Sequence, residues 1–514
     1  MNEAPSTLLN KPTPNRRLGL LVGVLGWALL SAGRPAAAAP AGAFDDWIVY
    51  HLTVEMFADG NRANDGEISG WKHPLYAGGD LQGILDHLDH LEKLGVNAVW
   101  LSPVFAARSS HGYDVTNYFA IADALGVPGK PDESLALFRK LRDELSKRGI
   151  RTILDIPLNH AAGVYRKPEG DPDGLRPRTT AARQDAEKLW DSWGGGYRYW
   201  DFGHEPTRRF LKNVALHWLR DEGVDGLRLD YVRGVPHDFW AELYAEVKAA
   251  KPGAFLVGEC WQDEGGAEGN AREIATYAAP IDGKPQFDAL LDFPLQSALV
   301  AAFARGGSAQ DLESSLKKFE AIVGTGAGLA RFLDNHDLAR FTAWADRPER
   351  LTAALGFMAS LSGPLVLYYG TETGLAHGGP KGGFTDAGRI PMPWGKLDPT
   401  LVEKTSRILK ARRAHPALSR GERLPLFADK TALAFAKKAG DETILVATNL
   451  GTTPRELTFD PKGLVPTGAT FEPVLGEAIP SFTSPEGTAL RWTLPPLSTL
   501  AVVVRAAAIP PAGG

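Results

Sequence analysis

Eight short apolar runs, rich in β-branched residues, alternate along the chain with stretches of helical periodicity. Amphipathic stretches such as 80–95 and 132–149 separate these runs. Strands that alternate with helices in this way indicate βαβ units and a parallel sheet. The runs that we predict to be strands are 47–54, 96–101, 151–156, 225–230, 254–259, 287–293, 329–335 and 364–369.

Eight is the number of strands that closes a parallel sheet into a (β/α)8 TIM barrel. The alternative is an open doubly wound sheet, which normally carries a glycine-rich phosphate-binding turn after its first strand. The corresponding segment here, HLTVEMFADGNRANDG (51–66), is not such a turn. We therefore predict an α/β protein with a barrel over 44–410.

One interval between the predicted strands is much longer than the others. Asp155, near the end of the third strand, is 75 residues before Asp230, whereas Asp230 is only 29 residues before Glu259. Because one βα unit needs about 30 residues, the third loop carries an insertion. We expect a small subdomain at 160–205 that walls the site at the carboxyl ends of the strands.

The pattern changes after about residue 400. A helical stretch at 401–418 is followed by short runs typical of antiparallel strands, and we predict a separate C-terminal β-sandwich domain over 420–506. The runs are 432–438, 442–450, 455–459, 489–494 and 498–505.

The first 43 residues have the pattern of a secretory signal peptide. An arginine pair at 16–17 precedes an apolar run over 18–32 and then a small-residue region, with cleavage expected after Ala38 or Ala43. The apolar run is short for a membrane-spanning helix, and the arginine pair leaves both general and twin-arginine export open. We expect an exported protein, periplasmic or secreted, with no stable membrane anchor.

Composition excludes some partners and cross-links. A net charge of −5 and an isoelectric point of about 6.2 give no basic field for nucleic acid. The single cysteine, Cys260, excludes an intramolecular disulfide, so stability outside the cytoplasm must come from the core or from a metal. We expect a monomer.

Charged residues stand at the carboxyl ends of the predicted strands, which converge in a barrel. They include Asp230, Glu259 and Asp337, and the alternation of a strand puts Arg228 on the same face as Asp230. Such a cluster suits either a divalent metal or glycoside hydrolysis, which needs a nucleophilic carboxylate and a carboxylic acid. A guanidinium beside Asp230 favours the ionised carboxylate and competes with a cation, so the hydrolase is favoured.

Four motifs, DIPLNH, GLRLD, GEC and FLDNHD, resemble in order the signature regions of the α-amylase family of retaining glycoside hydrolases. HGYDVTNY, GPLVLYYGTE and RIPMPW are similar to its secondary motifs. The resemblance covers about 44–506. It implies that Asp230 is the nucleophile, Glu259 the acid/base and Asp337 the third carboxylate, with Asp155 in a supporting role. The substrate contacts that it implies are His111, Tyr113, His160, Arg228, His336, Asp386 and Arg389.

This resemblance implies an α-glucan or oligosaccharide substrate, and we expect an α-amylase-type hydrolase of α-1,4 bonds in starch and maltooligosaccharides. Alternatives are a cyclomaltodextrinase-like, neopullulanase-like or maltogenic enzyme with transglycosylation, an inactive glycan-binding relative, or a metal-dependent hydrolase. Arg233 and Gly234 stand where the family often has Lys-His, which leaves specificity on the leaving-group side open. Trp261 suits either packing or a sugar-binding wall.

A loop rich in oxygen-bearing side chains, DGNRANDG (59–66), suits either a tight turn or calcium. It resembles the N-terminal calcium loop of cyclodextrin glycosyltransferases and neopullulanases, which implies structural Ca2+. Asn159 and Gly234 are similar to part of a second calcium site in the family. The implied ligands of the first site are Asp59, Asn61, Asn64, Asp65, Gly78 and Asp80.

Overall fold

The computed structural model describes most of the predicted barrel and C-terminal domain. Among the residues that the structure describes, no helix is both long and apolar enough to cross a membrane. Residues 1–41 of the expected leader, most of the expected insertion and Asp386 lie outside the described residues. The described ranges are 42–65, 78–162, 165, 197–262, 264–324, 327–376, 388–483 and 489–506.

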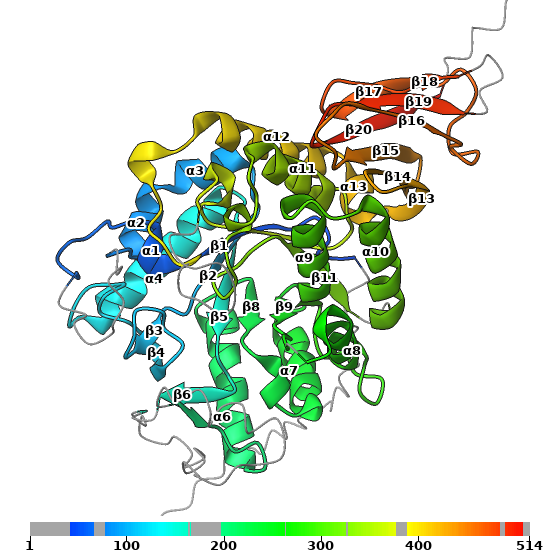
Figure 1. Cartoon of the computed structure of the whole chain (residues 1–514). Coiled ribbons are helices and arrows are strands. Elements are labelled where there is room, and N and C mark those ends of the chain that lie inside the picture. Colours follow the sequence, from blue (N-terminus) through cyan, green and yellow to red (C-terminus); the bar gives the residue numbers. More distant parts are fainter. Residues whose placement is uncertain are drawn as a thin grey trace, which may run out of the picture. The chain divides into compact units, whose positions relative to one another are not determined.

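Eight parallel strands close into a barrel in the spatial order β1-β12-β11-β10-β9-β8-β5-β2. Every one of the eight predicted strands contributes, so the predicted TIM barrel is confirmed (Figure 1). The bounds are β1 (Ile48–Leu52), β2 (Ala98–Leu101), β5 (Arg151–Ile156), β8 (Gly226–Leu229), β9 (Phe255–Gly258), β10 (Ala289–Leu291), β11 (Gly328–Phe332) and β12 (Leu365–Tyr368).

Alternate strand residues enter two separate apolar clusters. In β1, Ile48, Tyr50 and Leu52 join the large cluster that includes the helices. Val49 instead joins Trp100 in a smaller cluster built mainly from strand residues, which is the barrel interior. The interior is therefore a packed apolar floor, and the polar site lies above it at the strand ends.

The helix expected over 80–95 is divided into α2 (Leu81–Asp86) and α3 (Leu88–Leu94). Asp80 ends the preceding turn and caps α2, because its Oδ1 accepts a 2.7 Å hydrogen bond from Gly83 N–H. The helix expected over 132–149 is α4 (Pro131–Lys147). The other helices are α1 (Val54–Phe57), α6 (Glu205–Leu216), α7 (His237–Ala250), α8 (Gly266–Ala278), α9 (Phe293–Leu299), α10 (Ala309–Val323), α11 (Pro348–Ala359), α12 (Pro399–Ala414) and α13 (Pro416–Arg420).

Two short antiparallel ladders lie in the loops after the second and third barrel strands. β3 (Phe105–Ala107) pairs with β4 (Val115–Ile121), and β6 (His160–Ala162) pairs with β7 (Tyr197–Tyr199). The second ladder joins the two ends of the expected insertion, whose interior lies outside the described residues.

The C-terminal region consists of two antiparallel sheets, with strand orders β13-β14-β15-β20-β17 and β16-β19-β18. Apolar residues of both sheets, among them Leu445 and Trp492, share one core, which confirms the predicted sandwich. Sequence patterns missed β13, β17 and β18, since β13 and β17 contain prolines beside register shifts and β18 is only two residues long. The bounds are β13 (Glu422–Ala428), β14 (Ala432–Ala439), β15 (Glu442–Asn449), β16 (Arg455–Phe459), β17 (Thr470–Leu475), β18 (Ser481–Phe482), β19 (Leu490–Leu494) and β20 (Ser498–Arg505).

Candidate active site

Four carboxyl groups lie at the carboxyl ends of the barrel strands, as the sequence predicts. Asp155 is in β5, Asp230 directly follows β8, Glu259 directly follows β9, and Asp337 is in the loop after β11. All but Asp337 are more than nine-tenths buried. The closed barrel thus gathers acids that are far apart in the sequence at one face.

The guanidinium group of Arg228 contacts three of these carboxyl groups. Arg228 Nη1 donates to Asp155 Oδ1 at 2.7 Å and to Asp230 Oδ1 at 2.9 Å. Arg228 Nη2 lies 2.7 Å from Glu259 Oε2, but this charge contact lacks hydrogen-bond alignment. Arg228 and Asp230 therefore share the inward face of β8, as predicted, and Arg228 itself is fully buried.

Burial raises the pKa of Asp230 and of Glu259, although Arg228 opposes the shift in both. For Glu259 the pKa rises to about 7, with the Asp337 carboxylate adding to the effect of burial. Arg228 favours the ionised form of Asp230, as expected, but desolvation has the larger effect on the pKa of this carboxyl. The hydrogen bond from Nη1 favours ionised Asp230, and Glu259, which receives no aligned bond from Arg228, is the better place for a proton.

The backbone after Asp230 turns sharply toward Glu259. Tyr231 has a φ of 37°, in the left-handed region that costs a non-glycine residue on the order of 1 kcal/mol. This turn lets Tyr231 N–H donate to Glu259 Oε2 at 3.1 Å, while Asn159 Nδ2 donates to Tyr231 O at 3.2 Å. This strained turn therefore fixes the position of Asp230 relative to Glu259.

Tyr113 joins the acids to two histidines. Its hydroxyl donates to Asp155 Oδ2 at 2.8 Å and lies 2.7 Å from His336 Nε2, and the Tyr113 and His336 rings are nearly parallel. Burial holds the pKa of His336 well below its usual value, which favours the neutral imidazole. His160 Nε2 contacts Tyr113 O at 2.9 Å, and Tyr113 N–H donates to His111 Nδ1 at 3.1 Å.

Asp337 is held from two sides. Arg389 Nη2 donates to Asp337 Oδ1 at 2.9 Å, and His336 Nε2 lies 3.1 Å from Asp337 Oδ2. Arg389 also donates from Nε to His336 O at 2.9 Å. The structure therefore brings together the predicted catalytic and substrate-contact residues that it describes, while Asp386 lies outside the described residues.

Two residues in this network were missed by the sequence reasoning. Trp100 Nε1 donates to Asp155 Oδ2 at 3.0 Å, and the His51 ring stacks on Trp100 with centroids 3.7 Å apart. Burial lowers the pKa of His51 well below its usual value. His51 lies near the carboxyl end of β1 and Trp100 near the carboxyl end of β2. Their position at strand ends is the sequence signal that could have identified them.

The loop expected to bind calcium carries oxygen atoms that could serve as ligands. Asn64 Oδ1 and Asp65 Oδ1 are buried and have no hydrogen-bond partner. Gly78, with a φ of +71°, lets Asp65 approach so closely that a Cβ there would lie 2.4 Å from Asp65 Oδ1. Asp80 is already engaged, since it caps α2 and its Oδ2 accepts from Asn61 N–H at 2.8 Å. Hard, unpartnered oxygens on a tight loop fit Ca2+.

Fewer observations support the second expected calcium site. Asn159 Oδ1 is buried without a partner, and Gly234 ends the short turn Val232–Gly234. Across the described part of the chain, no three His, Cys, Asp or Glu side chains are grouped so that they could hold a metal ion. At the second site, a cation would therefore depend on amide and backbone oxygens.

Carboxyls gathered around a buried arginine at the mouth of a closed (β/α)8 barrel define a glycoside hydrolase. The family model "Alpha amylase, catalytic domain" matches residues 52–169 and 200–396. The chain belongs to the α-amylase family.

The chain is similar to proteins named cyclomaltodextrinase, neopullulanase and α-amylase. A cyclomaltodextrinase from a Bacillus species is 31% identical over 79% of this chain and 72% of its own length. Neopullulanase 2 from Thermoactinomyces vulgaris is 30% identical over 78% of this chain and 69% of its own length. The solved α-amylase of Geobacillus thermoleovorans, complexed with acarbose, is 26% identical, with a TM-score of 0.77 over 90% of this chain and 99% of its own.

Proposed function

We propose that this enzyme hydrolyses α-1,4-glucosidic bonds of cyclic and short linear maltodextrins with retention of configuration, in the manner of a cyclomaltodextrinase. The observation that carries the chemistry is the shared contact of Arg228 with Asp230 and Glu259, two carboxyls with raised pKa values at one barrel mouth. The preference for small and cyclic substrates rests on the relatives named cyclomaltodextrinase and neopullulanase.

In the first step, Asp230 attacks the anomeric carbon as Glu259 gives its proton to the leaving glycosidic oxygen. The bond to the leaving sugar breaks and a covalent glycosyl ester forms on Asp230. In the second step, Glu259 takes a proton from water, whose oxygen attacks the same carbon and releases Asp230. The pKa of about 7 allows Glu259 to act in both directions near neutral pH.

The surrounding residues act on the sugar that carries the reacting carbon. We assign Asp337, His336 and His160 to its hydroxyl groups and Tyr113, with His111 beside it, to its apolar face. Arg389 holds Asp337 through the 2.9 Å contact, and Asp155 fixes Arg228 and Tyr113. Such fixed partners cost no reorganisation when positive charge develops on the ring.

The second candidate is an α-amylase that prefers starch, supported by the likeness to the Geobacillus α-amylase. Initial rates on β-cyclodextrin, maltotriose, pullulan and starch separate the two. A higher kcat/KM for β-cyclodextrin than for starch supports the proposal, whereas the reverse order favours the α-amylase. Longer products formed from added maltose would show transglycosylation. No turnover of any of the four substrates would contradict both and favour a glycan-binding protein.

Structural Ca2+ and export are further parts of the proposal. Asn64, Asp65 and Gly78 would hold the ion with Asp59, Asn61 and Asp80, and it would stiffen the loop before α2 without entering the reaction. The leader at 1–43 would direct the chain across a membrane. The exported protein would be a soluble monomer. N-terminal sequencing of the exported protein and light scattering test these two points.

A further inference from the structure

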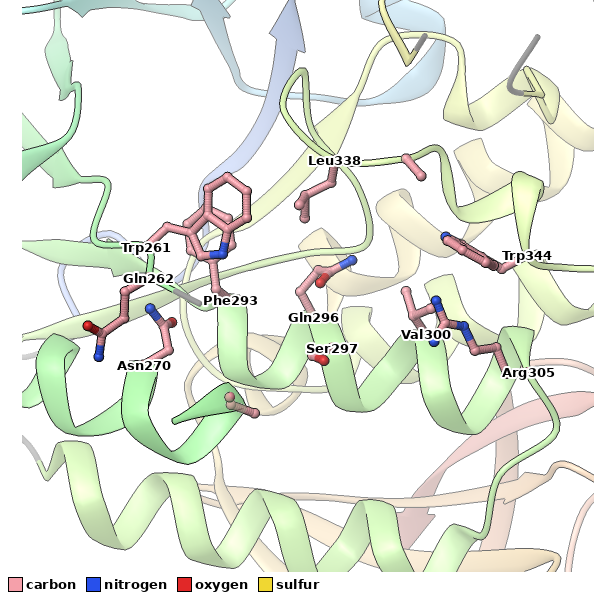
Figure 2. Close-up of a pocket in the computed structure, with 13 residues that line it drawn as sticks. Trp261, Gln262, Asn270, Phe293, Gln296, Ser297, Val300, Arg305, Leu338 and Trp344 are labelled. Carbon is pink, nitrogen blue, oxygen red and sulfur yellow. The ribbon is translucent and has the colours of Figure 1, made fainter. Parts of the chain in front are cut away.

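The helix α8 is attached to the segment that follows Glu259. Asn270 Nδ2, on the helix, donates to Cys260 O at 3.3 Å, and Gln262 Nε2 donates to Gly269 O of the helix at 2.8 Å. Figure 2 shows Gln262 and Asn270 next to each other, where both line a cavity. Because the two bonds run in opposite directions between the helix and the segment after β9, α8 is fixed relative to Glu259.

The same helix also holds the turn that follows Asp230. Arg233 Nε donates to Glu273 Oε1 on α8 at 3.1 Å, and Arg233 also makes a hydrogen bond to the side chain of Tyr231. The side chains of Arg233 and Glu273 are only 16% and 29% exposed, so solvent screens this ion pair less than a pair on the open surface. One arginine therefore joins the left-handed residue of the turn to a fixed helix.

This turn makes two backbone contacts to Glu259. Tyr231 N–H donates to the Glu259 carboxyl at 3.1 Å, and Val232 N–H donates to Glu259 O at 2.9 Å. The first contact depends on the left-handed conformation of Tyr231, which surrounding contacts must hold because it is unfavourable for a non-glycine residue. Trp240 Nε1 on α7 supplies one such contact by donating to Val232 O at 3.1 Å. Arg233 supplies another, on the side of α8.

The contacts of Arg233 lie within the protein. The sequence left its role open on the leaving-group side of the substrate, where the structure instead gives it a carboxylate partner on α8. The ionisable groups that act on Arg233 or that it acts on are Tyr231, Cys260, Glu273 and Tyr277.

We propose that Arg233 and Glu273 form a positioning pair, which holds the turn at Tyr231 against α8 and thereby sets the place of Glu259 beside Asp230. Neither member of the pair contacts the sugar. This inference rests on the proposed roles of Asp230 and Glu259 in glycoside hydrolysis. It adds two positioning residues that lie outside the four motifs resembling the signature regions of the family.

The pKa of Glu259 reports on this arrangement. Burial raises it to about 7, and the bond from Tyr231 N–H opposes the shift, so a loosened turn should raise the pKa further. Removing the negative charge of Glu273 acts in the opposite direction, because a nearby carboxylate favours the protonated form of Glu259. The direction of the change therefore separates positioning from charge. The other charged groups that act on Glu259 are Arg228, Asp155, Asp230 and Asp337.

The decisive test is the pH dependence of kcat/KM for maltotriose in Glu273→Ala. We expect the alkaline limb to move to higher pH by about half a unit, and kcat to fall about tenfold with an unchanged KM. The position of the limb does not depend on the fraction of enzyme that is folded. Glu268→Ala is the matched control, since Glu268 is on the same helix but pairs with Arg272 and Lys318, and its limb should stay in place.

Arg233→Ala and the variant that combines it with Glu273→Ala complete a double-mutant cycle. The combined variant should lose no more activity than either single variant, because the two side chains act as one unit. A limb in Glu273→Ala that stays in place or moves to lower pH, an equal movement in Glu268→Ala, or additive losses in the cycle would overturn the positioning pair. A raised KM confined to the variants that lack Arg233 would also overturn it and would assign Arg233 to the sugar.

Failure of the wild-type protein to cleave any glucan would instead contradict the proposed function. The positioning pair is then decided by a carbon-13 NMR titration of protein labelled at its glutamate carboxyls, with the Glu259 signal assigned by its loss in Glu259→Gln. A higher pKa of Glu259 in Glu273→Ala than in the wild type and in Glu268→Ala supports the pair. An equal or lower pKa rejects it.

Discussion

Asp155 and Arg228 lie directly opposite each other on the neighbouring strands β5 and β8, and a hydrogen bond of 2.7 Å joins them. Their register places the guanidinium where it also reaches Asp230 and Glu259. Asp155 additionally accepts from Tyr113 and Trp100. One buried carboxylate thus positions the residues around the two carboxyls that we assign to the reaction.

Asp155→Asn should lower kcat by about 100-fold while the fold is retained, because Arg228 and Tyr113 lose a charged partner. The Asp155 carboxylate also raises the pKa of Glu259, so its removal should move the alkaline limb of the pH profile to lower pH. A pH–rate profile of kcat/KM measures this shift. A fall in rate with an unmoved alkaline limb would contradict the electrostatic part of this role.

Asp230→Asn should reduce hydrolysis of maltoheptaose by about 10⁴-fold, since an amide cannot form the glycosyl ester. Circular dichroism and thermal melting should show a folded protein. Asp238→Asn, an exposed change on α7, is the control and should retain normal turnover. Near-normal activity of Asp230→Asn would eliminate this residue as the nucleophile.

The pH dependence of kcat/KM should have an alkaline limb near pH 7. Glu259 must carry a proton to act as the acid, and its raised pKa of about 7 means that this proton is lost as the pH rises through that value. The acid limb should lie above the usual range of an aspartate, because burial raises the pKa of Asp230 and its ionised form is the nucleophile. In Glu259→Gln the alkaline limb should disappear from the residual activity. Full activity persisting well above pH 8 would contradict the assignment of Glu259.

Removal of calcium should lower the melting temperature by about 5 °C, because an ion that binds only the folded loop stabilises it. Differential scanning calorimetry with and without a chelator measures the shift. Asp65→Asn should melt at one temperature in both conditions, whereas Asp86→Asn, an exposed change on α2, should respond like the wild type. The metal content of the protein is verified beforehand. A melting temperature of the wild type that does not change with the chelator would then exclude the calcium site.

Much of the fold and of the candidate site was predictable from local patterns. Each barrel strand is a short apolar run, and Asp230, Glu259 and Asp337 stand just beyond three of them. A closed parallel sheet brings all its strand ends to one face, so the order of motifs was sufficient to predict which acids meet. The weak strands β17 and β18 lacked such a signal, because their stability comes from pairing with β20 and β19.

The sequence by itself determined the closed barrel, the sandwich and the identity of the central acids, because strand periodicity and strand ends are local properties. Tertiary structure decided how Arg228 is shared and that desolvation raises the pKa of Asp230 as well as Glu259. It also decided that Trp100 supports Asp155. These properties depend on burial and on side-chain directions across elements distant in the sequence, and packing alone sets both.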